Sequence, residues 1–205
     1  MWTTIAFVVL ATLTSGQGRD WEYYMWGAAL AEVDPAAEPS CVFARPDGGG
    51  LPLTHAYAPG GAIVDATLTL SLVTSDGDPL VGLPAEDVWL MSTGSGLAPC
   101  GWGCLPDGPS DENGQMVWRE PLLAGGHTVG ESLVIALAGT PMQREFDITV
   151  KTPDQDGDRL VNLTDITIFA QALGSYVESC DFNDDGTVNL SDLARFTGGI
   201  GRTCP

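Results

Sequence analysis

Residues 153–165 read PDQDGDRLVNLTD, with aspartates at positions 1, 3, 5 and 12 of the twelve-residue window that begins at Asp154. A second window, DFNDDGTVNLSD, begins at Asp181, and its key residues lie 27 positions after their counterparts in the first. Carboxylates this close together repel one another unless a bound cation compensates their charge. An acidic turn in solvent does not explain why the pattern occurs twice, so the sequence predicts two metal-binding loops.

The spacing favours calcium, which takes roughly six to eight hard oxygen ligands and can obtain them from one short loop. Side chains at positions 1, 3, 5, 9 and 12 and the backbone carbonyl at position 7 would supply the oxygens, and a water often intervenes at position 9. The predicted ligands of the two Ca²⁺ ions are Asp154, Asp156, Asp158, Leu160, Asn162 and Asp165 in the first loop, and Asp181, Asn183, Asp185, Thr187, Asn189 and Asp192 in the second.

Each window leads into a predicted helix with one apolar stripe. The stripes are Ile166, Phe169, Ala170 and Leu173 after the first window, and Leu193, Ala194 and Phe196 after the second. Val161 and Val188, at position 8 of the windows, are expected to pair across a short two-stranded contact. Two facing stripes would make a core too small to be stable alone, so the folding of this unit is expected to depend on the ions.

The duplicated loop-and-helix pattern over residues 152–204 resembles a type I dockerin. The resemblance implies two F-hand calcium loops without an entry helix, and docking onto a cohesin domain. Position 6 of the first loop is Arg159, where the second loop has Gly186, and this predicts a weaker or distorted first site because glycine tolerates positive φ. Residues 163–164 and 190–191, which help dockerins to recognise cohesins, are Leu-Thr and Leu-Ser here, so ordinary cohesin docking is not expected.

The stretch before the loops is predicted to be an antiparallel β-sandwich. Between Ala62 and Thr74 apolar and polar residues alternate, which is typical of a half-buried strand. Further short strands, separated by turn-rich segments, are expected at residues 87–91, 116–119, 132–137 and 145–150. The turns at residues 75–82 and 110–116 resemble those of bacterial Ig-like domains of the invasin and intimin kind. That resemblance implies a structural or adhesive spacer.

The expected fold class is therefore mainly β, with three segments. These are an apolar N-terminal segment (1–20), an Ig-like β-sandwich (21–151) and a small α dockerin-like calcium-binding domain (152–205). The N-terminal segment is either a retained strand, buried in its own sheet or added to that of a neighbour, or a signal peptide. The retained strand is the preferred interpretation. The apolar run is too short to span a membrane as a helix.

Charge and cysteine content restrict the partners and the compartment. The chain has 27 Asp and Glu against 8 Lys and Arg, a formal charge of −19, which argues against binding to the phosphates of nucleic acid. Cys180 and Cys204 bracket the second loop and its helix and are expected to form a disulfide. Cys41 would pair with Cys100 or Cys104, or Cys100 with Cys104, and one of the five thiols is left over. Disulfides imply an oxidising, extracellular compartment.

Catalysis is not expected, because neither His55 nor His127 lies in a recognisable nucleophile or metal motif. Aromatic residues in 21–26, together with Trp89, Trp102 and Trp118, are expected to fill a core or an interface rather than to stack on sugars.

The preferred hypothesis is an extracellular calcium-binding structural protein that assembles with copies of itself into a filament or tube at the cell surface. The alternative is a carbohydrate-binding or adhesive module that its dockerin anchors to a cohesin-bearing scaffold.

Overall fold

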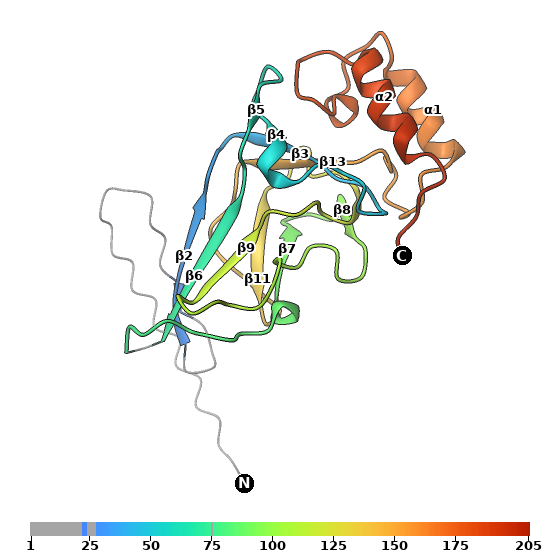
Figure 1. The fold of residues 1–205 in the computed structure, drawn as a ribbon. Coiled ribbons are helices and arrows are strands. Elements are labelled where there is room, and N and C mark those ends of the chain that lie inside the picture. The colour runs from blue at the N-terminus through green and yellow to red at the C-terminus, as the bar shows by residue number, and fades with distance from the viewer. Residues whose placement is uncertain (1–21, 24–27, 75) are drawn as a thin grey trace.

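The computed structural model describes residues 22–23, 28–74 and 76–205 of the chain. The predicted N-terminal strand or signal segment, and Trp21, Tyr24 and Trp26, lie outside the described residues. Strands dominate up to Lys151, and the two α-helices follow, which confirms the mainly β fold class (Figure 1). No helix of the described part combines the length and the apolar character that crossing a membrane requires.

The strands of the described part form four small sheets. The first sheet has, in spatial order, the strands β1 (Glu22–Tyr23), β2 (Ala28–Pro35), β6 (Leu68–Thr74) and β9 (Gln115–Trp118). The second has β12 (Thr140–Pro141), β11 (Leu133–Leu137) and β7 (Val88–Ser92). The third sheet has, in spatial order, the strands β13 (Ile148–Lys151), β3 (Ser40–Phe43), β4 (Ala56–Tyr57) and β5 (Ile63–Val64). The fourth is the pair β10 (Ala124–Gly126) and β8 (Leu97–Pro99). Short 3-10 helices span Leu53–His55 (η1) and Ala85–Asp87 (η2).

Most described strand pairs are antiparallel, as predicted, but β13 pairs with β3 in parallel. The parallel pair is possible because more than a hundred residues separate the two strands, so no tight hairpin has to connect them. The pair places β13 beside β3, so the C-terminal unit begins next to Phe43.

One core unites the sheets. Along β6 the side chains of Leu68, Leu70 and Leu72 are buried and the residues between them are partly exposed, which confirms the predicted alternation for this part of residues 62–74. The prediction of one strand over 62–74 is wrong, because residues 63–64 form β5 in a different sheet. Leu68 lies opposite Trp118 of β9, and these residues pack in the same cluster as the apolar side chains of β7 and β11. Each buried leucine of this kind stabilises the fold by roughly 1.5–3 kcal/mol relative to an exposed one.

The C-terminal unit repeats loop and helix twice. Its helices are α1 (Leu163–Ala172) and α2 (Leu190–Gly199), with the 3-10 helix η3 (Glu178–Cys180) between them. The rings of Phe169 and Phe196 stack at 4.6 Å between centroids, and those of Phe169 and Phe182 at 5.8 Å. Phe43 of β3 then packs edge-on against Phe182, with centroids 5.3 Å apart. The small core is therefore completed by the β part rather than closed on itself.

The predicted pairing of Val161 with Val188 is wrong. The amide of Val161 donates to the carbonyl of Arg202 at 2.9 Å, and its carbonyl accepts from the amide of Gly201 at 2.8 Å. Both valines are buried in the apolar cluster of the helices. The backbone partner of Val161 is thus the C-terminal tail.

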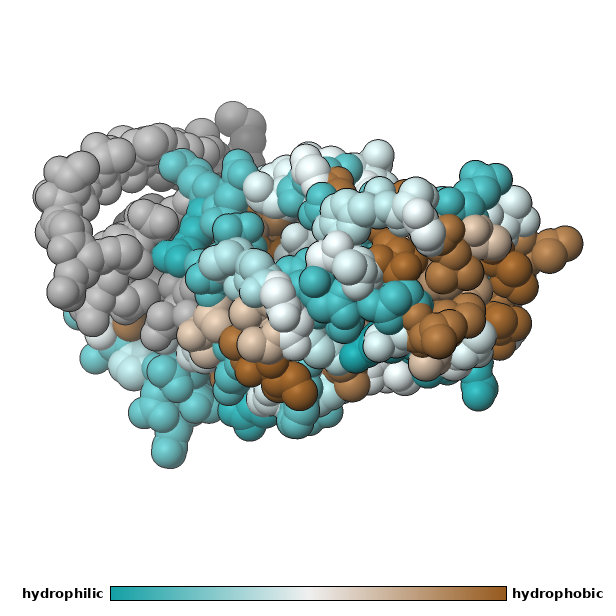
Figure 2. All heavy atoms as spheres, turned by 90° about the horizontal axis from the view of Figure 1, so that it is seen from above, coloured by the Kyte–Doolittle hydropathy of each residue, from teal (hydrophilic) through white to brown (hydrophobic). Residues whose placement is uncertain are grey.

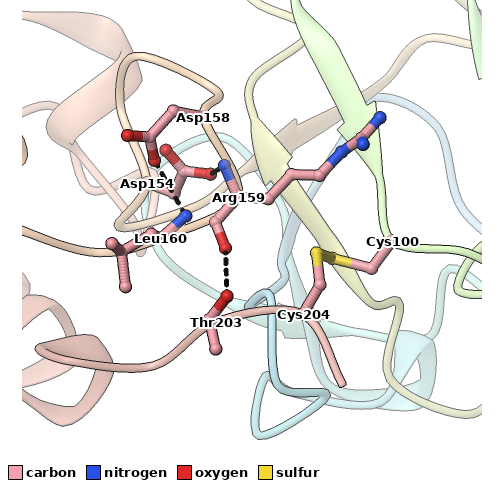
Figure 3. Close-up of a disulfide and its surroundings, with 7 residues drawn as sticks. All are labelled: Cys100, Asp154, Asp158, Arg159, Leu160, Thr203 and Cys204. Atoms are coloured by element: carbon pink, nitrogen blue, oxygen red, sulfur yellow. Dashed lines mark hydrogen bonds between the residues drawn. A yellow bond between two sulfur atoms is a disulfide. The ribbon is translucent and has the colours of Figure 1, made fainter.

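The same tail explains why the predicted Cys180–Cys204 disulfide is also wrong. Thr203 donates its hydroxyl hydrogen to the carbonyl of Arg159 at 3.0 Å, so the tail follows the first loop toward the β part (Figure 3). There Cys204 forms a disulfide with Cys100, just after β8, across a sequence separation of 104. Cys41, Cys104 and Cys180 are free and buried.

Candidate metal centre

In the first loop, buried Asp154 organises the backbone. One of its carboxylate oxygens accepts a hydrogen bond from the amide of Gly157 at 2.9 Å, and the other accepts from the amide of Arg159 at 2.7 Å. Asp158 accepts from the amide of Leu160 at 2.8 Å (Figure 3). These bonds wrap the chain around its own carboxylates.

The loop closes at the first turn of α1. Asp165 accepts from the amide of Gln155 at 2.7 Å through one oxygen, and from the amide of Asn162 at 2.8 Å through the other. The side-chain oxygen of Asn162 in turn accepts from the amide of Thr164 at 2.7 Å, which forms a capping box. Asp165 therefore ties the start of the loop to the start of the helix.

The second loop reproduces this network. Asp181 accepts from the amide of Gly186 at 2.9 Å, Asp185 from that of Thr187 at 2.9 Å, and Asp192 from that of Phe182 at 2.8 Å. The side chain of Asn189 caps α2, and its backbone amide donates a hydrogen bond to Asp192 at 2.9 Å. The predicted duplication is thus also a duplication of hydrogen bonds.

The predicted distortion at Arg159 does not occur in the backbone. Arg159 has φ +71°, close to the +85° of Gly186 at the same position of the second loop. Two positions earlier the roles are reversed, with Gly157 at +72° and Asp184 at +54°. Each loop therefore places glycine at one left-handed position and a larger residue at the other. A non-glycine residue there costs about 1–2 kcal/mol.

The oxygen atoms converge as a cation site requires. Carboxylate oxygens of Asp154, Asp156 and Asp158 lie within 4.8 Å of one another. In the second loop, Asn183 donates its amide hydrogen to Asp185 at 2.8 Å, and its buried side-chain oxygen has no hydrogen-bond partner among the described residues. A buried acceptor of this kind is costly unless something binds it, and Ca²⁺ prefers such oxygens. The residues present therefore fit the ion.

The asparagines at position 9 have a role that the prediction missed. Their side-chain oxygens cap the helices, while the amide nitrogens of Asn162 and Asn189 donate to Asp158 at 3.0 Å and to Asp185 at 3.3 Å. An asparagine followed by an aspartate three residues later is a capping signature that the sequence contains. These side chains orient the carboxylate at position 5, and their role as direct ligands stays a prediction.

Burial makes the loop carboxylates expensive to charge. It raises the pKa of Asp154 to about 6, and it also raises the pKa of Asp165 and of Asp181. Asp185 differs, because the hydrogen bond from the Thr187 hydroxyl lowers its pKa. A bound divalent cation would offset the burial cost at the three raised groups.

Both loops are built against the β part. The amide of Gly126, in β10, donates to the carbonyl of Asp154 at 2.8 Å, and a Cβ added to Gly125 would collide with the carboxylate of Asp154. The amide of Gly60, between β4 and β5, donates to the carbonyl of Asp184 at 2.7 Å. These contacts bring together residues that no local sequence pattern connects.

Lys151 is a further residue that the sequence reasoning missed. It is buried at the end of β13, and its ammonium donates to the carbonyl of Asp181 at 3.0 Å and to the carboxylate of Asp184 at 2.8 Å. The signal was available, because Lys151 is the only lysine of the chain and lies three positions before Asp154, the first residue of the first loop.

Comparisons of the chain with protein-family models, with curated proteins and with solved structures find no match.

Proposed function

We propose that this protein is an extracellular, calcium-binding structural protein whose residues 152–205 form a dockerin-like unit with one Ca²⁺ in each loop. The observation that carries the proposal is the duplicated hydrogen-bond network around the aspartates at positions 1 and 12 of both windows, together with the convergence of Asp154, Asp156 and Asp158 to within 4.8 Å in the first. The role is non-catalytic. The ions would hold the fold of a unit whose own apolar core is small.

Apolar residues on the outside of this unit favour assembly with another protein surface. Leu163 and Leu190 are 74% and 78% exposed at equivalent positions of the repeat, and Leu173 and Ile200 form a second exposed equivalent pair. Figure 2 shows apolar side chains gathered at the end of the molecule that carries the helices. Exposed apolar side chains gathered in this way are typical of interaction sites. We propose a second copy of this chain as the partner, in a homo-oligomer or polymer.

The alternative, an anchored carbohydrate-binding module, is favoured by one observation. Trp102 is 75% exposed in the turn between Cys100 and Cys104, whereas Trp118 is buried and donates its indole hydrogen to the carbonyl of Cys104 at 3.1 Å. An exposed indole can stack on a sugar ring. Trp118 thus fills the core as predicted, and Trp102 is the residue to test for glycan binding.

Calorimetry of the full chain tests the proposal. Titration is expected to give two Ca²⁺ per chain, and calcium at a hundredfold excess over its dissociation constant should add roughly 2.7 kcal/mol of stability per site. Asp158→Asn and Asp185→Asn change one position-5 ligand in each loop and should each reduce the stoichiometry or affinity of one site. A melting temperature that is the same in calcium and in excess EDTA would refute the proposal.

Assembly is tested by light scattering of the same samples. Leu163→Ser with Leu190→Ser should abolish any calcium-dependent increase in mass and leave both ion sites intact. Glycan-array binding that disappears in Trp102→Ala would support the alternative instead.

A further inference from the structure

The second loop has two faces, one toward the predicted ion and one toward the β part. The side chain of Lys151 has no solvent exposure. A lysine is rarely buried so completely unless its ammonium group is paired. Its partners are the backbone carbonyl of Asp181, a predicted ligand residue, and the carboxylate of Asp184. The ammonium group of Lys151, the only lysine of the protein, thus extends from the end of β13 and contacts the second loop on its face toward the β part.

Asp184 is held by the β part from two sides. Its carboxylate pairs with Lys151 at 2.8 Å, and its carbonyl accepts from the amide of Gly60 at 2.7 Å. A Cβ added to Gly61 would lie 3.1 Å from the Cβ of Asp185, so the turn between β4 and β5 approaches the loop as closely as glycine allows. These contacts belong to the same five residues that supply the ligands at positions 1, 3 and 5.

The comparison with the first loop shows what is specific about Asp184. The equivalent residue there is Gly157, which adopts the same left-handed backbone without strain. The second loop instead has an aspartate at φ +54°, and the aspartate brings a carboxylate to Lys151. A strained conformation of this kind persists only where surrounding contacts hold it.

From this arrangement we infer that Lys151 and Asp184 couple calcium binding in the second loop to attachment of the helical unit to the β part. The inference rests on the proposed calcium binding. An ion that orders Asp181, Asn183 and Asp185 also orders the atoms that Lys151 and Gly60 bind, and attachment in turn raises the affinity of the loop, since coupling is reciprocal. The first loop lacks this pair.

Whether Lys151→Met raises or lowers the calcium affinity of the second loop distinguishes coupling from simple charge repulsion. Removing the positive charge of Lys151 by Lys151→Met would strengthen binding of a divalent cation if the ammonium only repelled it. Coupling predicts the opposite, a loss of affinity of about fivefold or more at the second loop and little change at the first. Arg119→Met removes the same charge at an exposed site and serves as the matched control.

Affinities are measured separately for the two loops by NMR titration of the full chain with CaCl₂. The amide of Arg159 reports on the first loop and that of Gly186 on the second, because each donates to the aspartate at position 1 of its own loop. Asp184→Gly keeps the backbone conformation and removes the carboxylate. Asp184→Gly should reduce the calcium affinity of the second loop as much as Lys151→Met does. The double variant of Lys151→Met with Asp184→Gly should reduce it no further than either single change, because both remove the same interaction.

The single lysine allows an independent readout. Acylation of amines with an activated ester, quantified by mass spectrometry against the N-terminal amine, should modify Lys151 at least about fivefold more slowly in calcium than in EDTA. In Asp184→Gly this protection should be largely lost while the β part stays folded by near-ultraviolet circular dichroism.

Failure of the inference and failure of the proposed function give different results. If both amides respond to calcium but Lys151→Met binds as tightly as the wild type or more tightly, and acylation is equal with and without calcium, the coupling is refuted and calcium binding stands. If neither amide responds to calcium, calcium binding itself fails and the coupling fails with it.

Discussion

Arg159 and Gly186 occupy the same position of the two loops and adopt the same left-handed backbone, with φ of +71° and +85°. Their amides donate to equivalent aspartates, Asp154 at 2.7 Å and Asp181 at 2.9 Å. The hydrogen bond, not the residue type, therefore sets the local conformation, and the arginine carries the strain.

Replacing the strained residue should stabilise the protein. Arg159→Gly removes an unfavourable left-handed conformation and is expected to raise the free energy of unfolding by about 1 kcal/mol, measured by calorimetry in calcium. Gly186→Arg is the reverse change at an open site, where an added Cβ meets nothing within 4 Å, and should lower stability by a similar amount. Equal stability of the two variants would show that backbone strain is not the cause.

The Cys100–Cys204 disulfide should contribute strongly to stability, because it closes a loop with a sequence separation of 104. Cys204→Ser is expected to lower the free energy of unfolding by about 3–5 kcal/mol in denaturant titrations without reductant. Cys180→Ser, which removes a buried free thiol, serves as the comparison. A Cys204→Ser variant as stable as the wild type would contradict the role of this disulfide.

The three free thiols should resist alkylation in the folded protein. Burial raises the pKa of Cys41 and of Cys104 to about 12 and that of Cys180 to about 11, so very little thiolate exists at pH 8. Mass spectrometry after iodoacetamide treatment should show no modification of the native protein and three modified cysteines after unfolding without reductant. Modification of Cys204 under those conditions would mean that the disulfide is absent.

Glu131 should make one part of the β domain sensitive to acid. Hydrogen bonds from the Ser92 hydroxyl and from the amides of Gly96 and Ser95 lower its pKa. A lowered carboxylate pKa stabilises the fold above the ordinary value of 4.5, and this contribution is lost as pH falls through the lowered value.

Glu131→Gln should therefore lower the melting temperature at pH 7, and the difference from the wild type should shrink toward pH 3. Glu120→Gln, the same change at an exposed position, provides the control. A constant difference for Glu131→Gln across this pH range would exclude the carboxylate as the cause.

Local patterns in the sequence were sufficient for part of the fold. The alternation between Ala62 and Thr74 predicted the strand that became β6, because a half-buried strand needs only its own residues to reveal its two faces, but it did not show that residues 63–64 separate into β5. The two helices begin within the last three positions of the predicted loops, because the ligand pattern and the capping box share Asp165 and Asp192. The convergence of Asp154, Asp156 and Asp158 likewise follows from their spacing in the sequence.

Contacts between distant segments were not predictable in the same way. The partner of Cys204 depends on where the tail runs after Gly201, and Phe43 completes the helical core only because β13 returns beside β3. Lys151 gave a compositional signal, but its partners lie about 30 residues further along the chain. The asparagine caps show a different limit, since one side chain can satisfy a ligand pattern and a capping pattern at once.

The return of the tail to β8 decides how the molecule would carry a mechanical load. A force applied at the chain after Cys204 is transmitted through the Cys100–Cys204 disulfide directly to the β part, so the segment from Thr152 to Thr203 carries no tension. Reduction of that bond would redirect the pull through α2, the two loops and β13. The oxidised protein should therefore withstand stretching with its two acidic loops unloaded.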